Sequence, residues 1–378
     1  MNPSEITLDN ISSLSKDETI AAIAALSLEA SQKKLSQGAI KVLINSAYGA
    51  TASRFFRLYD KRLCESITMG GQTTTRLVSA RVNAWAQKEM NDPKLNILVA
   101  GDTDSIYLNV EPIVEKYMSG KTADEKLRFC RGLEKKVQLI IDRALAEMAD
   151  QLNCHENVMN MTRENITSSA VFLAKKKYAL KVIDSGGKIL SKPKLKITGL
   201  EMKKGGVPKG VYPMLERVIY IALDNDEATM QKYIAECRDA FFKLPVEMVA
   251  QGMNVGATEK YMQEDQQSLR EHQKETWVKG TPAQTKGVII HNQLIDKLGL
   301  GKKIQKIGES QRVRVVNLKL PNPTMSPVIA FQTAFPKDFQ LEPYFDYDFM
   351  YTKNFLEPVR RILTAIGWSE RRKKSLNV

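Results

Sequence analysis

The sequence predicts an α+β fold from the way helical and strand-like patterns are distributed along it. Helical patterns fill most of the chain up to Met90, and two apolar runs joined by a tight turn follow at 95–110. A further pair of strand-like runs lies at 172–197 before helical patterns return. Helices and neighbouring strands that occupy separate stretches of chain are typical of α+β rather than alternating α/β architecture.

Length and composition describe an ordinary globular chain with an excess of positive charge. The 378 residues suggest two or three domains, and 43% hydrophobic with 26% charged residues argues against general disorder. Lys and Arg number 56 against 43 Asp and Glu, which gives a net charge of +13. This excess favours a polyanionic partner, although charge alone does not choose between nucleic acid and a membrane surface.

Cysteine usage and hydropathy exclude several other classes. The four cysteines lack C-x-x-C spacing, which argues against a zinc site and against a secreted disulfide framework. The N-terminal residues do not form a signal peptide, and no apolar run reaches 18 residues. A cytoplasmic protein without a membrane partner is therefore expected.

The first third of the chain is expected to be helical. A capping box at Ser15–Glu18 predicts a helix over Thr19–Ala25, and a second helix is expected from about Glu29 to Tyr48. A long helix over Cys64–Met90 should end before the turn signal Asn91-Asp92-Pro93.

The middle of the chain should supply a hairpin and further strands. Leu95–Ala100 and Ser105–Val110 are apolar runs separated only by 101–104, which predicts a tight hairpin. A capping box at Thr122–Glu125 predicts a helix to about Leu152. Beyond it we expect a mostly helical last third, and the remaining expected elements are strands at 172–183, 188–197 and within 311–332, with helices at about 211–223, 227–242 and 351–367.

Two carboxylates stand at the hairpin turn. Asp102 and Asp104 flank one residue, and alternation along a strand would place both on one face. Paired carboxylates need a compensating cation, and Mg²⁺ commonly takes one or two carboxylates together with substrate phosphates. The alternative is a solvated turn in which aspartate caps the backbone.

A polar stripe runs along the helix that ends near residue 48. Gln37, Lys41, Asn45 and Tyr48 are spaced 4, 4 and 3 residues apart, so they share one helical face, while Val42–Ile44 are expected to cover the buried side. The Lys41 ammonium suits a phosphate, and Tyr48 suits a base or sugar. The alternative is the ordinary solvated face of an amphipathic helix.

A lysine cluster beside an aromatic residue forms a third candidate. Lys175, Lys176 and Lys177 precede Tyr178 and the apolar run 179–183. Ammonium groups next to an aromatic ring suit a nucleic-acid backbone. The alternative is a charged strand edge that prevents aggregation.

Together, and in this order, these segments resemble the B-family DNA polymerases, in particular the T-even-type phage replicative class. The likeness is strong over about 30–210 and fainter beyond. The segments that carry it are Lys41-x-x-x-Asn45-Ser46-x-Tyr48-Gly49, Gly101-Asp102-Thr103-Asp104-Ser105, Lys175-Lys176-Lys177-Tyr178, Leu195–Glu201 with Pro208-Lys209, and Phe355–Pro358.

The resemblance implies a right-hand polymerase with an antiparallel palm sheet and flanking helices. Residues 1–50 would be the C-terminal half of the fingers, 51–200 the palm and 201–378 a mostly helical thumb. Asp104 would be the principal metal ligand, with Asp102 close to two Mg²⁺ ions that Mn²⁺ could replace.

The same resemblance assigns the binding residues. Lys41 would contact the incoming deoxynucleoside triphosphate, Asn45 would support that face, and Tyr48 would check the nascent base pair. The DNA contacts would come from Gly49 and from the cluster Lys175, Lys176, Lys177 and Tyr178, which would hold the primer–template.

Parts of such an enzyme are missing from the sequence. The D-x-x-S-L-Y-P-S-type motif that supplies another aspartate is not found, nor are the carboxylates of the proofreading exonuclease. We therefore expect a partner chain that supplies both, together with the other fingers helix. Met1 and the polar residues after it favour a natural C-terminal subunit over a piece cut from a longer chain.

Three alternatives stay open at this point. The chain could be a non-catalytic basic module that only binds primer–template, a degenerate polymerase remnant. An RNA-directed enzyme is a weaker rival. A sliding clamp remains among the expected partners, although the tail Lys373–Val378 has no aromatic residue for docking on it.

Overall fold

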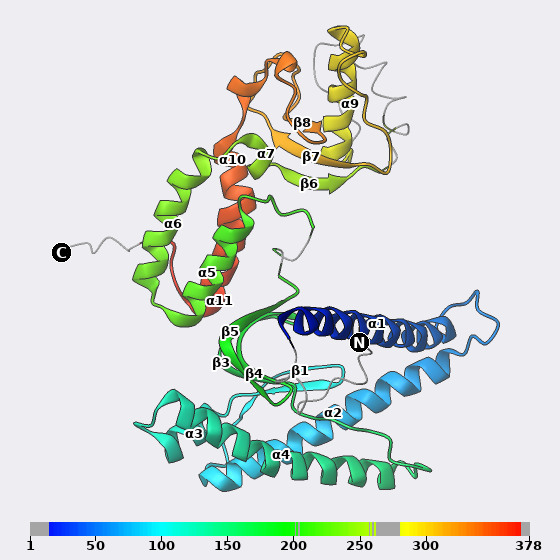
Figure 1. Cartoon of the computed structure of the whole chain (residues 1–378), viewed down its shortest axis with the longest axis vertical. Coiled ribbons are helices and arrows are strands. Elements are labelled where there is room, and N and C mark those ends of the chain that lie inside the picture. The colour runs from blue at the N-terminus through cyan, green and yellow to red at the C-terminus, as the bar shows by residue number, and fades with distance from the viewer. Residues whose placement is uncertain are drawn as a thin grey trace. The chain divides into compact units, whose positions relative to one another are not determined.

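The computed structural model describes residues 15–200, 202, 205–256, 258, 261 and 280–371. Its contacts divide the chain into two compact units, with the boundary between Thr162 and Arg163. Both units combine helices with antiparallel strands, in agreement with the predicted α+β class (Figure 1). The finer division into fingers, palm and thumb stays a prediction.

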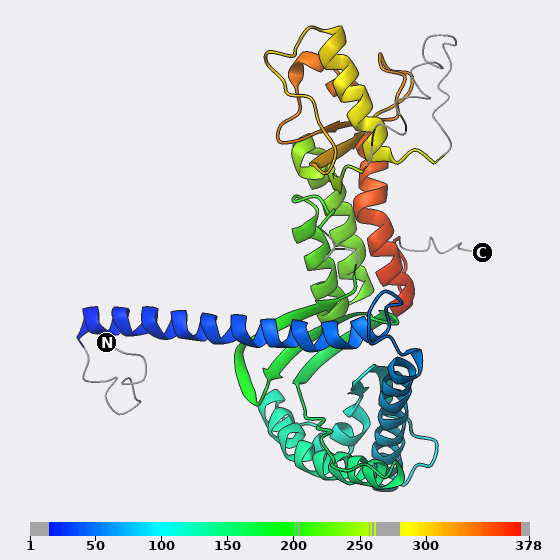
Figure 2. The same cartoon turned by 90° about the vertical axis from the view of Figure 1, so that its right-hand side faces the viewer.

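The first unit begins with two long helices, α1 (Lys16–Thr51) and α2 (Lys61–Met90). The predicted capping box is present, since Ser15 and Glu18 exchange hydrogen bonds at the start of α1. The expected break between two helices at 25–29 is wrong, because Leu26-Ser27-Leu28 contains neither glycine nor proline and the helix continues through it. Figure 2 shows α1 as one straight helix that extends beyond the other described elements of its unit.

The helix α2 packs against α4 (Ala123–Gln151) to form the core of the first unit. Val78 and Val82 of α2 and Ala144 and Leu145 of α4 are buried in this core together with Ile97. The remaining elements of the unit are the strands β1 (Leu98–Asp102) and β2 (Ser105–Leu108), and the helix α3 (Glu111–Met118).

Two sequence predictions hold well in this unit. The hairpin β1–β2 forms as expected, and Thr122 and Glu125 form the predicted capping box of α4. The strand β1 begins three residues later than expected. The reason is that Asn83 of α2 binds Ile97 N and Leu95 O, which fixes 95–97 as a connection.

The second unit begins with a three-stranded antiparallel sheet in the order β3–β4–β5. Its strands are β3 (Asn165–Ala174), β4 (Lys177–Ser185) and β5 (Lys188–Thr198). The single strand expected over 172–183 is therefore wrong. Lys175 and Lys176 form a turn inside it, and Lys176 adopts a left-handed conformation with φ +61° that ends the extended backbone.

The last third is mostly helical and has strands within 311–332, as expected, but it also has a strand at 251–254 that the sequence did not predict. Residues 251–331 contain a second antiparallel sheet in the order β6–β7–β8, covered by α9 (Figure 1). The elements of this third are α5 (Tyr212–Asp224), α6 (Glu227–Phe242), α7 (Val246–Val249), β6 (Gln251–Asn254), α9 (Ala283–Lys297), β7 (Arg312–Asn317), β8 (Val328–Phe331), α10 (Tyr347–Tyr351), a π-helical turn Thr352–Leu356 and α11 (Glu357–Ile366).

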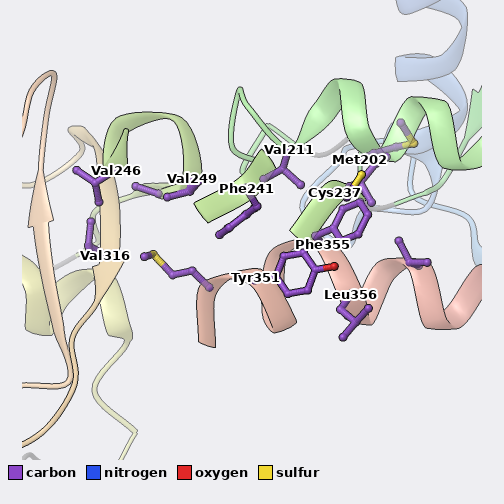
Figure 3. Packing of buried hydrophobic residues seen from close by; sticks show 14 of the residues in the cluster. Met202, Val211, Cys237, Phe241, Val246, Val249, Val316, Tyr351, Phe355 and Leu356 are labelled. Atoms are coloured by element: carbon purple, nitrogen blue, oxygen red, sulfur yellow. The ribbon is translucent and has the colours of Figure 1, made fainter. Parts of the chain in front are cut away.

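Aromatic side chains join the helices of the second unit. Figure 3 shows Phe241 of α6 beside Tyr351 and Phe355. The rings of Phe241 and Tyr351 meet edge to face at 5.3 Å, and Tyr351 stacks on Phe355 at the same separation. The Tyr351 hydroxyl donates to Ile234 O at 3.1 Å, so this buried phenol is satisfied.

Candidate active site

The carboxylate turn, defined as Asp102–Asp104, joins β1 to β2, and only Thr103 and Asp104 lie between the two strands. Asp102 is the last residue of β1 and pairs with Ser105, the first residue of β2. Thr103 has φ +49°, and the Asp104 N–H donates to Asp102 O at 2.5 Å. Strand alternation does not continue through this conformation, so it does not place the two carboxylates on one strand face, contrary to the prediction.

The helix α2, which is not part of the hairpin, contacts the carboxylate turn. The Thr75 hydroxyl lies 3.0 Å from Thr103 O, and the hydroxyl of Ser105 donates to Asp102 O at 3.1 Å. A Cβ at Gly101 would lie 3.8 Å from Thr75 Cγ2, an ordinary van der Waals separation, so helix and strand are in contact here. The turn is therefore in contact with α2, a relationship that the sequence did not indicate.

The oxygen donors of the turn fit part of a magnesium site. Asp104 is exposed, and Asp102 is half-buried with its Oδ1 accepting from the Thr103 hydroxyl at 3.1 Å. Two carboxylates are a usual protein contribution to Mg²⁺ bound with substrate phosphates. Among the described residues no group of three His, Cys, Asp or Glu side chains could hold a metal ion. A two-metal centre would therefore need carboxylates beyond these two.

The polar stripe of α1 is exposed along its whole length. Lys41, Asn45 and Tyr48 all face solvent, as expected. The prediction that Val42–Ile44 cover a buried side is wrong, because these three side chains are 63–70% exposed. Of the described residues of α1, only Ala22 is buried. The apolar side of α1 is therefore an uncovered surface.

Tyr48 connects the polar stripe to α2. The Cys64 thiol of α2 neighbours its phenol, and this interaction is the main reason that the pKa of Tyr48 is raised. Nearby, the Asp60 N–H donates to Thr51 O at 3.1 Å and closes the connection between the helices. Cys64 and Thr75 are eleven residues apart on α2, or about 16 Å along its axis. The same helix thus neighbours Tyr48 and is hydrogen-bonded to the carboxylate turn.

The basic turn, defined as Lys175–Lys177, belongs to the second unit. Lys175 and Lys176 are exposed at the tip between β3 and β4, and Lys177 begins β4. Tyr178 is 7% exposed and its ring lies 5.5 Å from that of Phe172. The lysines are thus the accessible part of this motif, while the tyrosine packs in the sheet.

The remaining sequence predictions concern Gly49, the C-terminal tail and membrane-spanning helices. Gly49 is exposed near the end of α1, where a Cβ would meet no other atom within 4 Å. The tail Lys373–Val378 lies outside the described residues. Within the part of the chain that the structure describes, none of the helices combines the length and apolarity needed to cross a membrane.

Comparison with known proteins identifies the family. The sequence pattern of DNA polymerase family B matches residues 24–276, and the chain belongs to this family. This range includes the polar stripe, the carboxylate turn and the basic turn, so all three predicted motifs lie within the match.

Two relatives illustrate how much of such a polymerase the chain represents. It is 28% identical over 352 residues to the DNA-directed DNA polymerase of Enterobacteria phage T4, and 28% identical over 358 residues to that of Escherichia phage RB69. Each alignment covers 89% of this chain but only 38% and 37% of the respective relative. The chain therefore spans well under half the length of these polymerases.

Proposed function

We propose that this chain is the C-terminal part of a replicative DNA-directed DNA polymerase and acts with a separate chain that supplies the N-terminal part. The observation that carries the proposal is the carboxylate turn held by α2 within a family B sequence. Two carboxylates at this turn are too few for two metal ions. The partner would supply the other catalytic aspartate and the proofreading exonuclease.

The proposed reaction is nucleotidyl transfer from a deoxynucleoside triphosphate to the primer 3′ end. The primer 3′-oxygen attacks the α-phosphorus in line, and pyrophosphate leaves. Asp104 and Asp102 would hold Mg²⁺, and the bound ion would supply positive charge to offset the negative charge on the phosphate oxygens. Mn²⁺ offers similar coordination chemistry and would replace Mg²⁺.

The side chains of this chain would contribute mainly binding and positioning. On α1, the Lys41 ammonium would contact the triphosphate, with Asn45 beside it and Tyr48 toward the nascent base pair. Exposure of all three side chains is consistent with these roles. The basic turn and Gly49 would contact the primer–template backbone, and Tyr178, whose ring packs beside Phe172 in the sheet, would support the basic turn from inside.

The uncovered apolar side of α1 is the proposed contact with the partner chain. Leu28, Leu35 and Val42 recur every seven residues and are 62%, 74% and 64% exposed. Ala21 occupies the preceding position of the same series, and Ala39 lies between two of its members. Large apolar residues at heptad spacing with small residues beside them are typical of helix–helix contacts. We expect one long helix of the partner to pack along this row.

Native mass spectrometry of the chain with its N-terminal partner tests this assembly. A 1:1 complex is expected, and Leu35→Asp should weaken it by placing a charge in an apolar contact. Lys34→Asp changes the preceding residue, which lies on the polar side of α1, and should leave the complex intact. Equal effects of the two substitutions would contradict the proposed contact.

A further inference from the structure

The basic turn rests against the backbone of Gly199, the residue that follows β5. Tyr178 pairs with Thr198 at the end of the β4–β5 ladder, so Gly199 lies just beyond the last pair. A Cβ at position 199 would lie 3.0 Å from the Lys176 carbonyl carbon and closer still to its oxygen. It would also lie 3.3 Å from Lys177 Cγ. Only a glycine leaves room for the turn in this position.

Backbone conformation restricts the same position independently. Gly199 has φ +65°, and Lys176, on the other side of the contact, has φ +61°. L-residues rarely adopt this left-handed region, and strained backbone of this kind persists only where the surrounding structure holds it. Two left-handed residues in contact therefore define where the basic turn lies relative to β5.

The same sheet offers a comparison that separates the two restrictions. Gly186, in the turn between β4 and β5, has φ +57°, but a Cβ there would meet no atom within 4 Å. At position 186, glycine is therefore favoured only by the left-handed backbone conformation. At position 199, glycine is favoured both by the left-handed backbone conformation and by the close approach of the basic turn.

We propose that Gly199 is a positioning residue for DNA binding, because it seats the basic turn and so fixes where Lys175–Lys177 present their ammonium groups. The inference rests on the proposed DNA-binding role of these lysines. Beyond that role, it states that the backbone of the basic turn is held in one position, from which all three ammonium groups reach the DNA. The residue after β5 and the DNA-contacting turn then move as one element.

Limited trypsin digestion of the full-length chain tests the seating without DNA. Gly199→Ala should accelerate cleavage after Lys175–Lys177 about tenfold, because the turn can no longer pack against position 199. Gly186→Ala is the matched control and should leave that cleavage rate unchanged. Unchanged cleavage in Gly199→Ala, with its circular dichroism spectrum intact, would overturn the proposal.

A double variant covers the case in which Gly199→Ala does not fold. Adding Lys176→Gly allows the turn to move away from the new methyl group without backbone strain. Recovered folding with rapid cleavage after Lys175 supports the proposal. Continued unfolding of the double variant overturns it, because the damage would then lie elsewhere than in the turn.

Primer–template affinity, measured by fluorescence anisotropy at two salt concentrations, tests the functional step. Gly199→Ala should weaken binding about tenfold and reduce the salt dependence, as expected when Lys–phosphate contacts are lost. In the Lys175→Ala/Lys176→Ala/Lys177→Ala background, Gly199→Ala should cause no further loss. An additive loss would contradict positioning through these lysines.

The two assays separate failure of the inference from failure of the proposed function. If the triple lysine variant binds DNA like the wild type, the basic turn is not a DNA contact, and that part of the proposed function fails. Trypsin cleavage then still reports whether Gly199 seats the turn. If the triple variant binds weakly but Gly199→Ala binds normally, the lysines act without Gly199 and the inference fails alone.

Discussion

The Thr75 hydroxyl of α2 lies 3.0 Å from the carbonyl oxygen of Thr103, and this contact holds the carboxylate turn against the helix. The same hydroxyl lies 2.9 Å from Gly71 O, so its proton is shared between the helix and the turn. The residue that separates Asp102 from Asp104 is thereby tied to a helix that also contacts Tyr48.

Thr75→Val should loosen this turn while preserving the shape of the side chain. We expect about 1 kcal/mol lower unfolding free energy, the usual contribution of one hydrogen bond. Polymerase turnover in the reconstituted complex should fall about tenfold, since catalysis depends on carboxylate position. Thr73→Val is the control, because the Thr73 hydroxyl bonds only to Met69 O within α2 among the contacts of the described residues. Equal turnover in both variants would show that the turn does not depend on Thr75.

Asp104→Asn should abolish turnover of the reconstituted complex. We expect a loss of at least about a thousandfold in kcat with primer–template affinity largely unchanged, because the carboxylate would act on the metal and not on DNA. Asp124, an exposed acidic residue in the first turn of α4, provides the control Asp124→Asn. Single-turnover primer extension measures the effect, and an active Asp104→Asn complex would refute the assignment.

Lys41→Ala should chiefly weaken use of the nucleotide. Loss of an ammonium–phosphate contact should raise the apparent KM for deoxynucleoside triphosphate about tenfold or more, with a smaller effect on primer–template affinity. Lys34 lies seven residues earlier on the same face of α1, and Lys34→Ala should have little effect. A wild-type KM for Lys41→Ala would remove this residue from the nucleotide site.

The stability of the second unit should fall as pH drops below about 6.5. His291 is 3% exposed in α9, and burial lowers its pKa, so the folded state takes up the proton less readily than the unfolded state. Stability is therefore complete above the unfolded pKa of about 6.5 and declines as pH falls through it. Thermal melts at pH 7.5 and 5.5 should show a smaller shift for His291→Leu. The exposed His155 is the control, and equal shifts for wild type, His155→Gln and His291→Leu would contradict this role.

Local chemistry made part of this structure predictable from sequence. Ser15 and Thr122 cap their helices through residues three positions away, and the hairpin at 102–105 is set by a two-residue turn. In each case the interacting groups are close in sequence. The residue types therefore contain most of the information needed to place these elements.

Features that depend on distant partners were not predictable. The strand β6 has only four residues and is defined by pairing with Arg312–Val315, about sixty residues later. The apolar side chains of Val42–Ile44 led us to expect that their side of the helix packs against another element. Their sequence alone does not say which element or chain that would be. Likewise, a glycine after β5 does not reveal by itself that the Lys176 carbonyl lies against it.

Primer extension with the purified chain, alone and with its N-terminal partner, tests the central claim most directly. The reaction would contain primer–template, the four deoxynucleoside triphosphates and Mg²⁺. We predict no extension by this chain alone, extension by the 1:1 complex, and loss of that activity with Asp104→Asn. Robust extension by the pure single chain would contradict the need for a partner, and an inactive complex that still binds primer–template would favour a non-catalytic binding module.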